Sequence, residues 1–294
     1  MKFSARVLEV GSIETLTKVA AMIAKLSKLC CIRITGEKLC FVQNGHGTRE
    51  HVHRLWLEIE AQQFFDDYRL DGFTADANEI CLELSSEDLH RALRPSSVQQ
   101  QIRQLKMKLT KRGDQPYLTI ELRIPSLAEG GHRLVTHNVP ANLLAPRLWN
   151  EYKEPTLPDF DVSLYMPSAK VLQKIISNMK NIGTHVTFAG NSKGLMYLAV
   201  DTDTVTIKTQ FRDLEIATWT DLNNSAAASS VIPRSSDVFY SARIDLKAAS
   251  NFLLSLSNMP GNRLIASIVQ KRLIHFYAST DDLTLHYFMP AIVL

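Results

Sequence analysis

The stretch PANLLAPRLWNEYKEPTLPDFD, residues 140–161, divides the 294-residue chain into two parts of similar length. It contains four prolines: Pro140, Pro146, Pro155 and Pro158. Proline lacks a backbone N–H and has a fixed φ, so it interrupts both helices and inner strands. We therefore predict an extended connector over residues 140–160 that belongs to neither sheet. It separates an N-terminal domain (1–139) from a C-terminal domain (161–294).

Four segments, two on each side of the connector, have the caps and the apolar spacing of helices. The first covers residues 12–28 with Ser12 as its cap, and the second begins at Ser85. The third follows Ser168, and the fourth opens at Asp245. Their predicted core-facing residues are Leu16, Val19, Ile23, Leu26, Leu89, Leu93, Val171, Leu172, Ile175, Met179, Leu246, Ala249, Leu253 and Leu256.

Most of the remaining chain alternates apolar and polar residues, as residues 118–124 do in LTIELRI. This period of two is typical of antiparallel sheets with one buried and one solvated face. Each half has the order strand, helix, several strands, helix and three final strands, ending at Pro140 and at Pro290. The sequence therefore predicts an α+β fold of two similar domains that arose by duplication, each with antiparallel β-sheets and two helices.

The bulk composition excludes several classes of protein. The 33 basic and 30 acidic residues leave a net charge of +3, so any contact with nucleic acid requires charges sorted onto separate faces. The N-terminal stretch lacks the apolar core of a signal peptide, and no apolar run is long enough for a membrane span. Residues 44–53, 126–131 and 213–237 are predicted to be irregular surface loops, and the serine-rich part at 225–236 could be phosphorylated.

The side chains that carry catalysis or bind metals form no recognisable motif. Cys30, Cys31, Cys40 and Cys81 lie in apolar runs without C-x-x-C spacing, which predicts buried free thiols and no metal site. The chain has no phosphate-binding glycine loop. His46, His51 and His53 cluster in a loop without nearby cysteines, where an adventitious metal site is a weaker alternative. We predict no cofactor and no enzyme activity.

Several blocks of sequence resemble one known family. They are MIAKLSKLCCIRI from Met22, LWLEIEAQQFFDDYRLDG from Leu55, EICLELSSEDLHRAL from Glu79, RLVTHNVPANLLAPRLWNEYKEPTLPD from Arg133, DVSLYMP from Asp161 and LHYFMPA near the C-terminus. In this order they resemble the Hus-type subunit of the nine-one-one DNA-damage checkpoint clamp, within the PCNA-like sliding clamps. The resemblance covers nearly the whole chain and fails only in the three loops.

The resemblance implies a DNA clamp fold in which the helices line a central channel. It also implies a nuclear protein that joins two PCNA-like Rad-family subunits in a heterotrimeric ring. A clamp loader places such a ring around double-stranded DNA without sequence specificity, and the ring recruits checkpoint and repair proteins. Two alternatives stay open, a PCNA-like homotrimeric replication clamp and, with little support, a DNA exonuclease.

If the helices line a channel, their polar faces should carry the DNA-facing residues. These would be Lys18, Lys25, Lys28, Arg91, Arg94, Lys170, Lys174, Lys180 and Lys247. Basic residues outnumber acids at these outward positions, and Glu14, Glu87 and Asp88 fall in first turns, where acids suit the helix dipole. The alternative is that lysines on an amphipathic helix only form a solvated face.

The resemblance also implies a subunit interface and a peptide pocket. Clamp subunits join through edge strands, which here would present Val135, His137 and Val139 in the first domain and Val205, Ile207 and Thr209 in the second. In related clamps a groove under the connector receives peptides, which would here meet Leu144, Leu148, Trp149 and Tyr152. The alternatives are an edge blunted by the chain itself, and apolar residues that only fasten the connector to the sheet.

Overall fold

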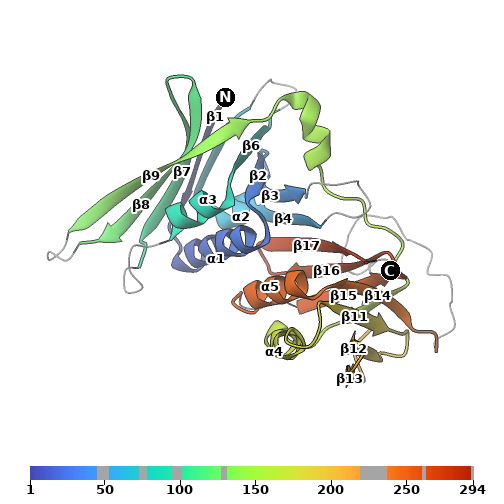
Figure 1. Ribbon diagram of the computed structural model, residues 1–294. Helices are drawn as coiled ribbons and strands as arrows, with labels where there is room; N and C mark the ends of the chain where they lie inside the picture. The colour runs from blue at the N-terminus through green and yellow to red at the C-terminus, as the bar shows by residue number, and fades with distance from the viewer. Residues whose placement is uncertain are drawn as a thin grey trace. The chain divides into compact units, whose positions relative to one another are not determined.

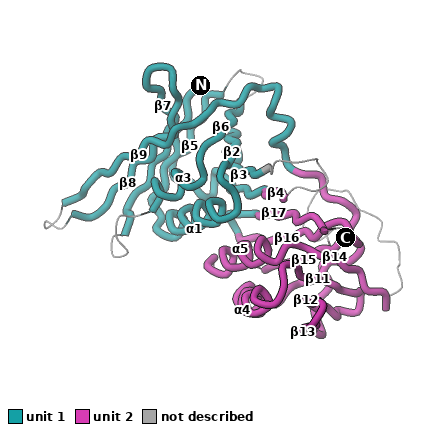
Figure 2. Tube along the Cα trace, in the orientation of Figure 1, with its two compact units in different colours: residues 1–43, 56–154, 281–284 teal, residues 44–55, 155–280, 285–294 magenta. Residues whose placement is uncertain are grey.

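The computed structural model describes residues 1–44, 53–72, 78–94, 101–126, 131–218, 237–259 and 263–292. It divides into two compact units, shown in Figure 2. Unit 1 contains residues 1–43, 56–154 and 281–284, and unit 2 contains residues 44–55, 155–280 and 285–294.

Unit 1 is built mainly from strands, with two longer helices, α1 and α3 (Figure 1). Its elements are β1 (Lys2–Val7), α1 (Val10–Leu26), β2 (Leu29–Ile34), β3 (Lys38–Asn44), β4 (Arg54–Glu60), α2 (Ala61–Phe64), β5 (Asp67–Asp71), β6 (Ile80–Ser85), α3 (Ser86–Leu93), β7 (Gln104–Arg112), β8 (Gln115–Pro125), β9 (His132–Leu143) and the 3-10 helix η1 (Pro146–Tyr152).

Unit 2 repeats this plan with fewer short elements. They are β10 (Val162–Tyr165), α4 (Ala169–Met179), β11 (His185–Gly190), β12 (Met196–Asp201), β13 (Thr206–Phe211), β14 (Tyr240–Asp245), α5 (Leu246–Leu256), β15 (Arg263–Val269), β16 (Leu273–Ser279) and β17 (Leu283–Pro290).

The strand pairing is the same in the two units. Unit 1 has the antiparallel orders β5-β1-β7-β8-β9 and β4-β3-β2-β6. Unit 2 has β10-β15-β16-β17 and β13-β12-β11-β14, and an isolated bridge between Leu164 and Ile216 takes the place of the β1–β5 pair. The duplication predicted from the order of elements is therefore confirmed, and so is the α+β class.

Each sheet turns its apolar side to the core. On β8, Leu118, Ile120, Leu122 and Ile124 are at most 1% exposed, whereas Arg123 is exposed. In Figure 1, α1 and α3 lie together in unit 1, as α4 and α5 do in unit 2. Each helix pair thus covers the core of its own unit, and its polar face is left for other contacts.

The beginning of α1 differs from the prediction. The helix starts at Val10 with Glu9 at its N-cap, so Ser12 is not the cap and lies in the first turn. The Ser12 hydroxyl donates a hydrogen bond to the Glu9 carboxylate at 3.0 Å, and the Ile13 N–H donates to the Glu9 carbonyl. Ser12 was misread because a serine within the first turn and a serine at the cap look alike in sequence.

The caps predicted for α3 and α5 are confirmed. The Ser85 hydroxyl accepts from the Asp88 N–H at 3.2 Å, and the Asp245 carboxylate accepts from the Ala248 N–H at 2.6 Å. These bonds satisfy backbone donors that a helix leaves free in its first turn.

The buried face of α4 matches the prediction at Leu172 and Met179 and differs from it at Val171 and Ile175. Leu172, Ile176 and Met179 are buried, whereas Val171 is 47% exposed and Ile175 is only half-buried. Adjacent apolar pairs at 171–172 and 175–176 fit either phase of a helical repeat, so the choice depends on how α4 packs against α5.

All four cysteines are buried and form no disulfide, as predicted. Among the residues placed in the structure, no helix combines the length and the apolar character that a membrane crossing requires. Residues 45–52, 127–130 and 219–236 lie outside the described ranges, and with them His46, His51 and the serine-rich segment.

Candidate DNA and partner interfaces

The polar faces of the unit 1 helices carry three cations and three acids. On α1, the Lys18 Nζ lies 3.8 Å from the Glu14 carboxylate one turn earlier, and Lys25 is exposed in the last turn. On α3, the Arg91 guanidinium lies 3.1 Å from Glu87 and 3.7 Å from Asp88. The two helices themselves therefore carry no net charge, histidine aside.

Two further predicted cations of unit 1 lie at helix ends. Arg94 is the exposed C-cap of α3. Lys28 was predicted inside the first helix, but α1 ends at Leu26 with Ser27 as its cap. Lys28 instead occupies the link to β2, where its carbonyl accepts from the Ser86 N–H at 3.0 Å. Its side chain is exposed, so it can still meet solvent or a ligand.

The charged residues on the polar faces of the unit 2 helices are all cations. Lys170 and Lys174 stand one turn apart on α4, Lys247 stands in the first turn of α5, and Lys180 caps α4. All four side chains are exposed, and neither helix contains an acid. No carboxylate in the described ranges forms an ion pair with them. A surface of this kind attracts phosphate groups without reading a base sequence.

The strand β9 forms an edge of unit 1. Residues 132–140 pair with β8 on one side, and in the described part of the chain no strand covers their other side. Val135 and His137 are half-buried and Val139 is buried, as expected for side chains that alternate along such a strand. The backbone of this edge can accept a further strand.

The strand β13 forms an edge of unit 2. It pairs with β12, and within the described residues it has no second neighbour. Ile207 and Thr209 lie on β13 and are half-buried. Val205, predicted within the strand, instead closes the turn before it, where its N–H donates to the Thr202 hydroxyl at 3.0 Å.

Leu134 begins the stretch of β9 that was predicted to be the edge strand, although it was not named among the interface residues, and it is 63% exposed. It lies opposite Arg123 on β8, and so points away from the core residues of that strand. The unpaired edge can pair with another chain, and the exposed Leu134 side chain adds apolar area beside it. The sequence signal was weak because Leu134 and Val135 are adjacent, so that either could be the core residue.

The connector begins as a strand, which corrects the prediction that it belongs to neither sheet. Ala141 and Leu143 at the end of β9 pair with Leu84 and Leu82 of β6. Pro140 is accommodated because it lies where β9 leaves β8 for β6, and Pro146 because a helix start needs no N–H. The residues after β9 form η1, and unit 1 extends to Glu154.

The apolar residues of the connector pack onto unit 1. Trp149 is 5% exposed, and its Nε1–H donates to the Leu144 carbonyl at 2.9 Å. Its ring belongs to a buried group that we call the cysteine cluster: Cys31, Cys40, Val42, Trp56, Cys81 and Trp149. Leu144 and Tyr152 pack against this cluster, and Leu148 is half-buried. Trp149 is thus a fastening residue, and the peptide pocket stays a prediction that involves the more exposed Leu144, Leu148 and Tyr152.

Two thiols of the cysteine cluster, those of Cys31 and Cys40, are kept protonated by their surroundings. Burial raises the pKa of Cys40 to about 12. A hydrogen bond with Cys81, followed by burial, raises the pKa of Cys31. Because thiolates are the reactive form of cysteine, these thiols act as apolar packing and not as nucleophiles.

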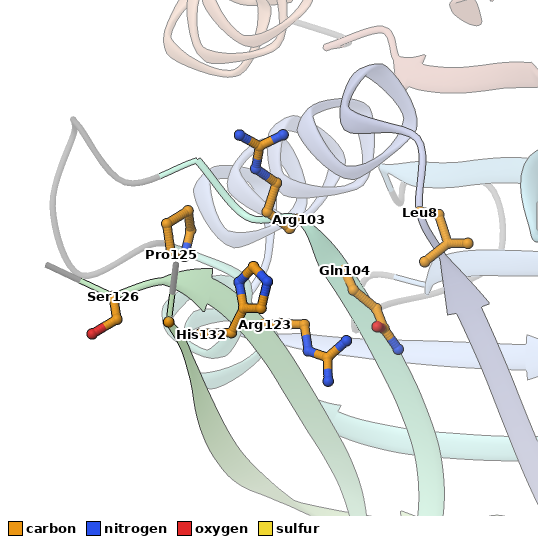
Figure 3. Close-up of a pocket in the computed structure, with 8 residues that line it drawn as sticks. Leu8, Arg103, Gln104, Arg123, Pro125, Ser126 and His132 are labelled. Atoms are coloured by element: carbon orange, nitrogen blue, oxygen red, sulfur yellow. The ribbon is translucent and has the colours of Figure 1, made fainter. Parts of the chain in front are cut away.

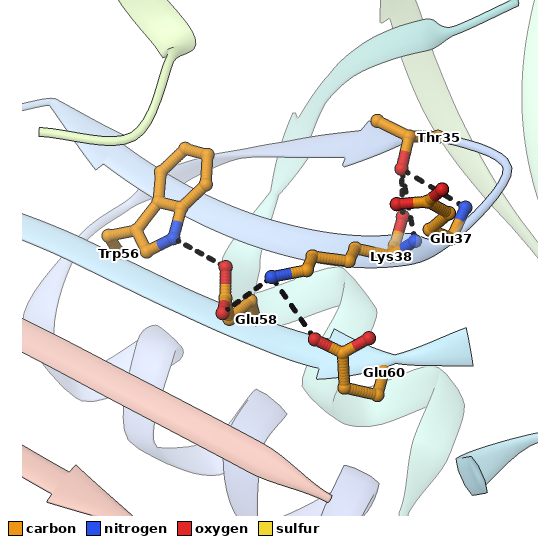
Figure 4. A network of polar contacts seen from close by, with 6 residues as sticks. All are labelled: Thr35, Glu37, Lys38, Trp56, Glu58 and Glu60. Atoms are coloured by element: carbon orange, nitrogen blue, oxygen red, sulfur yellow. Dashed lines mark hydrogen bonds and ion pairs between the residues drawn. The ribbon is translucent and has the colours of Figure 1, made fainter. Parts of the chain in front are cut away.

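A polar network bounds the cysteine cluster at β3 and β4 (Figure 4). The Glu58 carboxylate accepts from the Trp56 Nε1–H at 3.2 Å and from Lys38 Nζ at 2.9 Å. Lys38 also lies 3.1 Å from Glu60. Burial acts to lower the pKa of Lys38, but the hydrogen bonds to Glu58 and Glu60 raise it overall. The network holds the Trp56 ring in place under the connector.

A family model described as Hus1-like protein matches residues 1–293. Among curated proteins, the chain is 34% identical to "Checkpoint protein HUS1" of Homo sapiens over 294 residues, covering 99% of this chain and 100% of that protein. It is 25% identical to "Checkpoint protein Hus1-like" of Drosophila melanogaster, with 100% of each covered. It is 26% identical to "Checkpoint protein hus1" of Schizosaccharomyces pombe over 215 residues, covering 73% of this chain and 71% of that one.

Solved structures of sliding clamps share the fold. Proliferating cellular nuclear antigen of Entamoeba histolytica superimposes with a TM-score of 0.68 at 13% identity, covering 99% of both chains. A structure described as the C-terminal region of FEN-1 bound to A. fulgidus PCNA gives a TM-score of 0.63 at 14% identity, again covering 99% of both chains. The clamp fold expected from the sequence blocks is confirmed.

Proposed function

The chain belongs to the Hus1-like protein family, and on this premise we propose that it is one subunit of a heterotrimeric sliding clamp that encircles DNA at damage sites. The observation that carries the proposal is the family match over residues 1–293 on a duplicated clamp fold. Two other PCNA-like subunits of the Rad family complete the ring in this proposal.

The two edge strands support assembly into a ring. An unpaired β9 at one edge and an unpaired β13 at another provide two different surfaces, again with reference to the residues described. Contacts between unlike surfaces are heterologous, and such contacts form a closed ring when the rotation between subunits closes. Leu134 on β9 and Val205 beside β13 add exposed apolar area to the two edges.

The helix faces support contact with DNA. Lysines such as Lys170, Lys174 and Lys247 can neutralise phosphates of any sequence, which a sliding clamp requires. Retention on DNA then depends on closure of the ring more than on these contacts.

The clamp is proposed to be a non-catalytic and nuclear platform. The curated relatives are named checkpoint proteins, which supports a role in signalling without chemistry of its own. A clamp loader would open and close the ring, and checkpoint and repair proteins would bind to it. Incubation of the pure protein with labelled DNA and magnesium or manganese is expected to leave the DNA intact.

Co-purification tests the assembly. We expect this chain to come through size exclusion as a monomer when alone and as an equimolar ternary complex with two PCNA-like partners. Leu134→Glu should abolish the complex without unfolding the chain, because the side chain is 63% exposed. Leu29→Glu is a matched control, since Leu29 is also exposed (44%) but lies on β2, away from the edge. A trimer of this chain alone would instead support a homotrimeric clamp.

A further inference from the structure

A basic hollow of about 540 Å³ opens on unit 1 at the beginning of β7, the end of β8 and the beginning of β9 (Figure 3). The side chains that give it chemical character are Arg103, Gln104, Arg123 and His132, with Leu8 and Pro125 as apolar walls. None of them belongs to the proposed DNA or connector surfaces, and His132 is the first residue of the β9 edge.

The register of the strands places the hollow on the solvent face of the sheet. Gln104 lies opposite Arg123, and Pro125 lies opposite His132. The residues next to Arg123 along β8, Leu122 and Ile124, are at most 1% exposed and face the core. Because side chains alternate along a strand, Arg123 and Pro125 must point the other way. Arg123, Gln104 and Pro125 therefore lie on the face of the sheet away from α1 and α3, whereas Arg103 rises toward the helix at the rim of the hollow (Figure 3).

The positive charge of the hollow is not neutralised by its surroundings. In the described ranges no carboxylate pairs with Arg103 or Arg123, both of which are exposed. The neighbouring acid Glu121 is engaged by Lys108, and Asp66 accepts from the Leu8 N–H at 2.7 Å. Two residues after Gln104 on β7, Lys106 lies opposite Arg6 of β1, and both cations add to the positive field of the hollow.

We propose that this hollow binds a phosphorylated serine or threonine side chain on a segment of a partner protein. The Arg123 guanidinium, which lies on the same side as Gln104 in Figure 3, provides forked N–H donors that match a phosphate better than a lysine ammonium does. The Gln104 amide and the His132 imidazole add neutral donors, and Leu8 and Pro125 can pack against the residues that flank the phosphate. The proposed DNA surface of unit 2 is rich in lysine, whereas the residues that line this hollow include arginine and histidine but no lysine.

Concavity favours a peptide over duplex DNA. A phosphorylated side chain can enter a hollow of this size, whereas a duplex offers its phosphates along an extended backbone and suits a long basic stripe. The proposal goes beyond the clamp function, and it can be tested on the isolated full chain, so failure of ring assembly would not affect it.

Fluorescence anisotropy with two labelled peptide pools tests the proposal. Both pools have random flanks, one around a central phosphoserine and the other around serine. We expect the phosphoserine pool to bind at least tenfold more tightly, with inorganic phosphate as a competitor. Arg123→Ala should weaken its binding at least tenfold, and Arg123→Lys should recover only part of the loss, because lysine cannot form the bidentate contact.

Arg112→Ala is the matched control, since Arg112 is an exposed arginine at the other end of β7, and its loss should leave binding unchanged. Indistinguishable binding of the two pools, or an Arg123→Ala protein that binds as the wild type does, would overturn the proposal. A third outcome would also overturn the proposal. If a 20-base-pair duplex displaces the peptide, and if binding of the duplex is itself lost in Arg123→Ala, the hollow binds DNA.

Discussion

Units 1 and 2 have the same strand order, but the helices of unit 1 carry no net charge, histidine aside, whereas those of unit 2 are positively charged. In α1 and α3, three cations face three acids, and Lys18 and Arg91 lie within 4 Å of carboxylates. In α4 and α5, Lys170, Lys174 and Lys247 have no acid on either helix. The difference shows that duplication preserved what the core needs and left the polar faces free to diverge, because exposed charges contribute little to stability.

The units also differ in how the chain leaves their last strand. After β9 the connector packs Trp149 onto the cysteine cluster of unit 1. After β17 the backbone of unit 2 makes two hydrogen bonds, from Ala291 N–H to the Arg272 carbonyl and from Ile292 N–H to the Arg243 carbonyl. Unit 1 should therefore depend on its connector far more than unit 2 depends on the residues after β17.

The largest expected effect is that of Trp149→Ala. Removing a buried tryptophan should destabilise unit 1 by about 3–5 kcal/mol, because the ring leaves a cavity in the cysteine cluster. Urea unfolding combined with hydrogen exchange measures this, with faster exchange expected in β2 and β6 and no change in β11 and β12.

Trp149→Phe separates packing from hydrogen bonding. It keeps an aromatic ring but loses the bond to the Leu144 carbonyl, so a loss of only about 1 kcal/mol from that bond is expected, besides a smaller packing loss. Equal destabilisation of both units by Trp149→Ala would contradict the separate roles assigned to the connector and to the residues after β17.

Acidification should weaken unit 2 selectively. His275 is fully buried in unit 2, its Nε2 lies 3.1 Å from His286 Nδ1, and its ring stacks on Phe160 and Phe288. Burial, and then the charge of His286, lower the pKa of His275 well below its usual 6.5. The unfolded chain therefore binds a proton before the folded one does. The contribution of neutral His275 to the stability of unit 2 is therefore fully present above pH 6.5. Below pH 6.5 this contribution falls by about 1.4 kcal/mol per pH unit.

Urea unfolding at pH 7.5, 6.5 and 5.5 measures this loss, and exchange of unit 2 amides localises it. In the double variant His275→Phe/His286→Phe the dependence between pH 6.5 and 5.5 should flatten. A smaller residual slope is expected from His53, whose pKa burial also lowers. An unchanged slope in the double variant would show that other groups control the acid response.

Charge removal should affect DNA binding more in unit 2 than in unit 1. In the assembled ring, Lys170→Ala/Lys174→Ala/Lys247→Ala should make the slope of log K against log salt less negative by up to about 2.7, at about 0.9 for each phosphate contact. That corresponds to about a sixfold smaller loss of affinity for each doubling of salt.

The matched triple variant is Lys18→Ala/Lys25→Ala/Arg91→Ala on the unit 1 helices. A change in slope of about 1 is expected, because Glu14, Glu87 and Asp88 already offset two of these cations. Titrations of a labelled duplex at four salt concentrations measure both slopes. Equal slopes for the two variants would mean that the intrahelical ion pairs open on DNA.

The smallest effect concerns helix caps. Ser85→Ala should cost about 1 kcal/mol, because the hydroxyl accepts from the Asp88 N–H at the start of α3. Ser168→Ala at the start of α4 should cost only a few tenths, since the Ser168 side chain makes no cap hydrogen bond. Thermal unfolding of the two variants checks the difference, and a larger loss for Ser168→Ala would contradict it.

Much of the fold could be predicted because its signals are local. The caps at Ser85 and Asp245 depend on residues three positions away, and the alternation along β8 depends on immediate neighbours. The apolar stripe of α5 at Leu246, Ala249, Leu253 and Leu256 was also correct, since its spacing is local, although the buried Phe252 was not predicted. Repetition of such signals on either side of residues 140–161 made the duplication visible.

The candidate sites were less predictable because they depend on distant residues. The sequence could list cations on helices but could not say that Arg91 is paired and Lys174 is not. It also assigned Trp149 to a possible pocket, whereas the structure buries it against cysteines more than 60 residues earlier. The hollow around Arg103 and Arg123 gave no local signal at all, since its lining comes from three strands, the links beside them and the residue after β1.

By itself the sequence determined the helices, the strands, the duplicated order and the family, because propensity, capping and period are properties of short segments. Only the tertiary structure decided which face of α4 is buried, where the connector attaches and which charges stay unpaired. Each of these features depends on which distant surfaces meet. The apolar pairs at 171–172 and 175–176 illustrate the reason. Either residue of each pair could face the core at the same local free energy, and packing of α4 against α5 decides which one does.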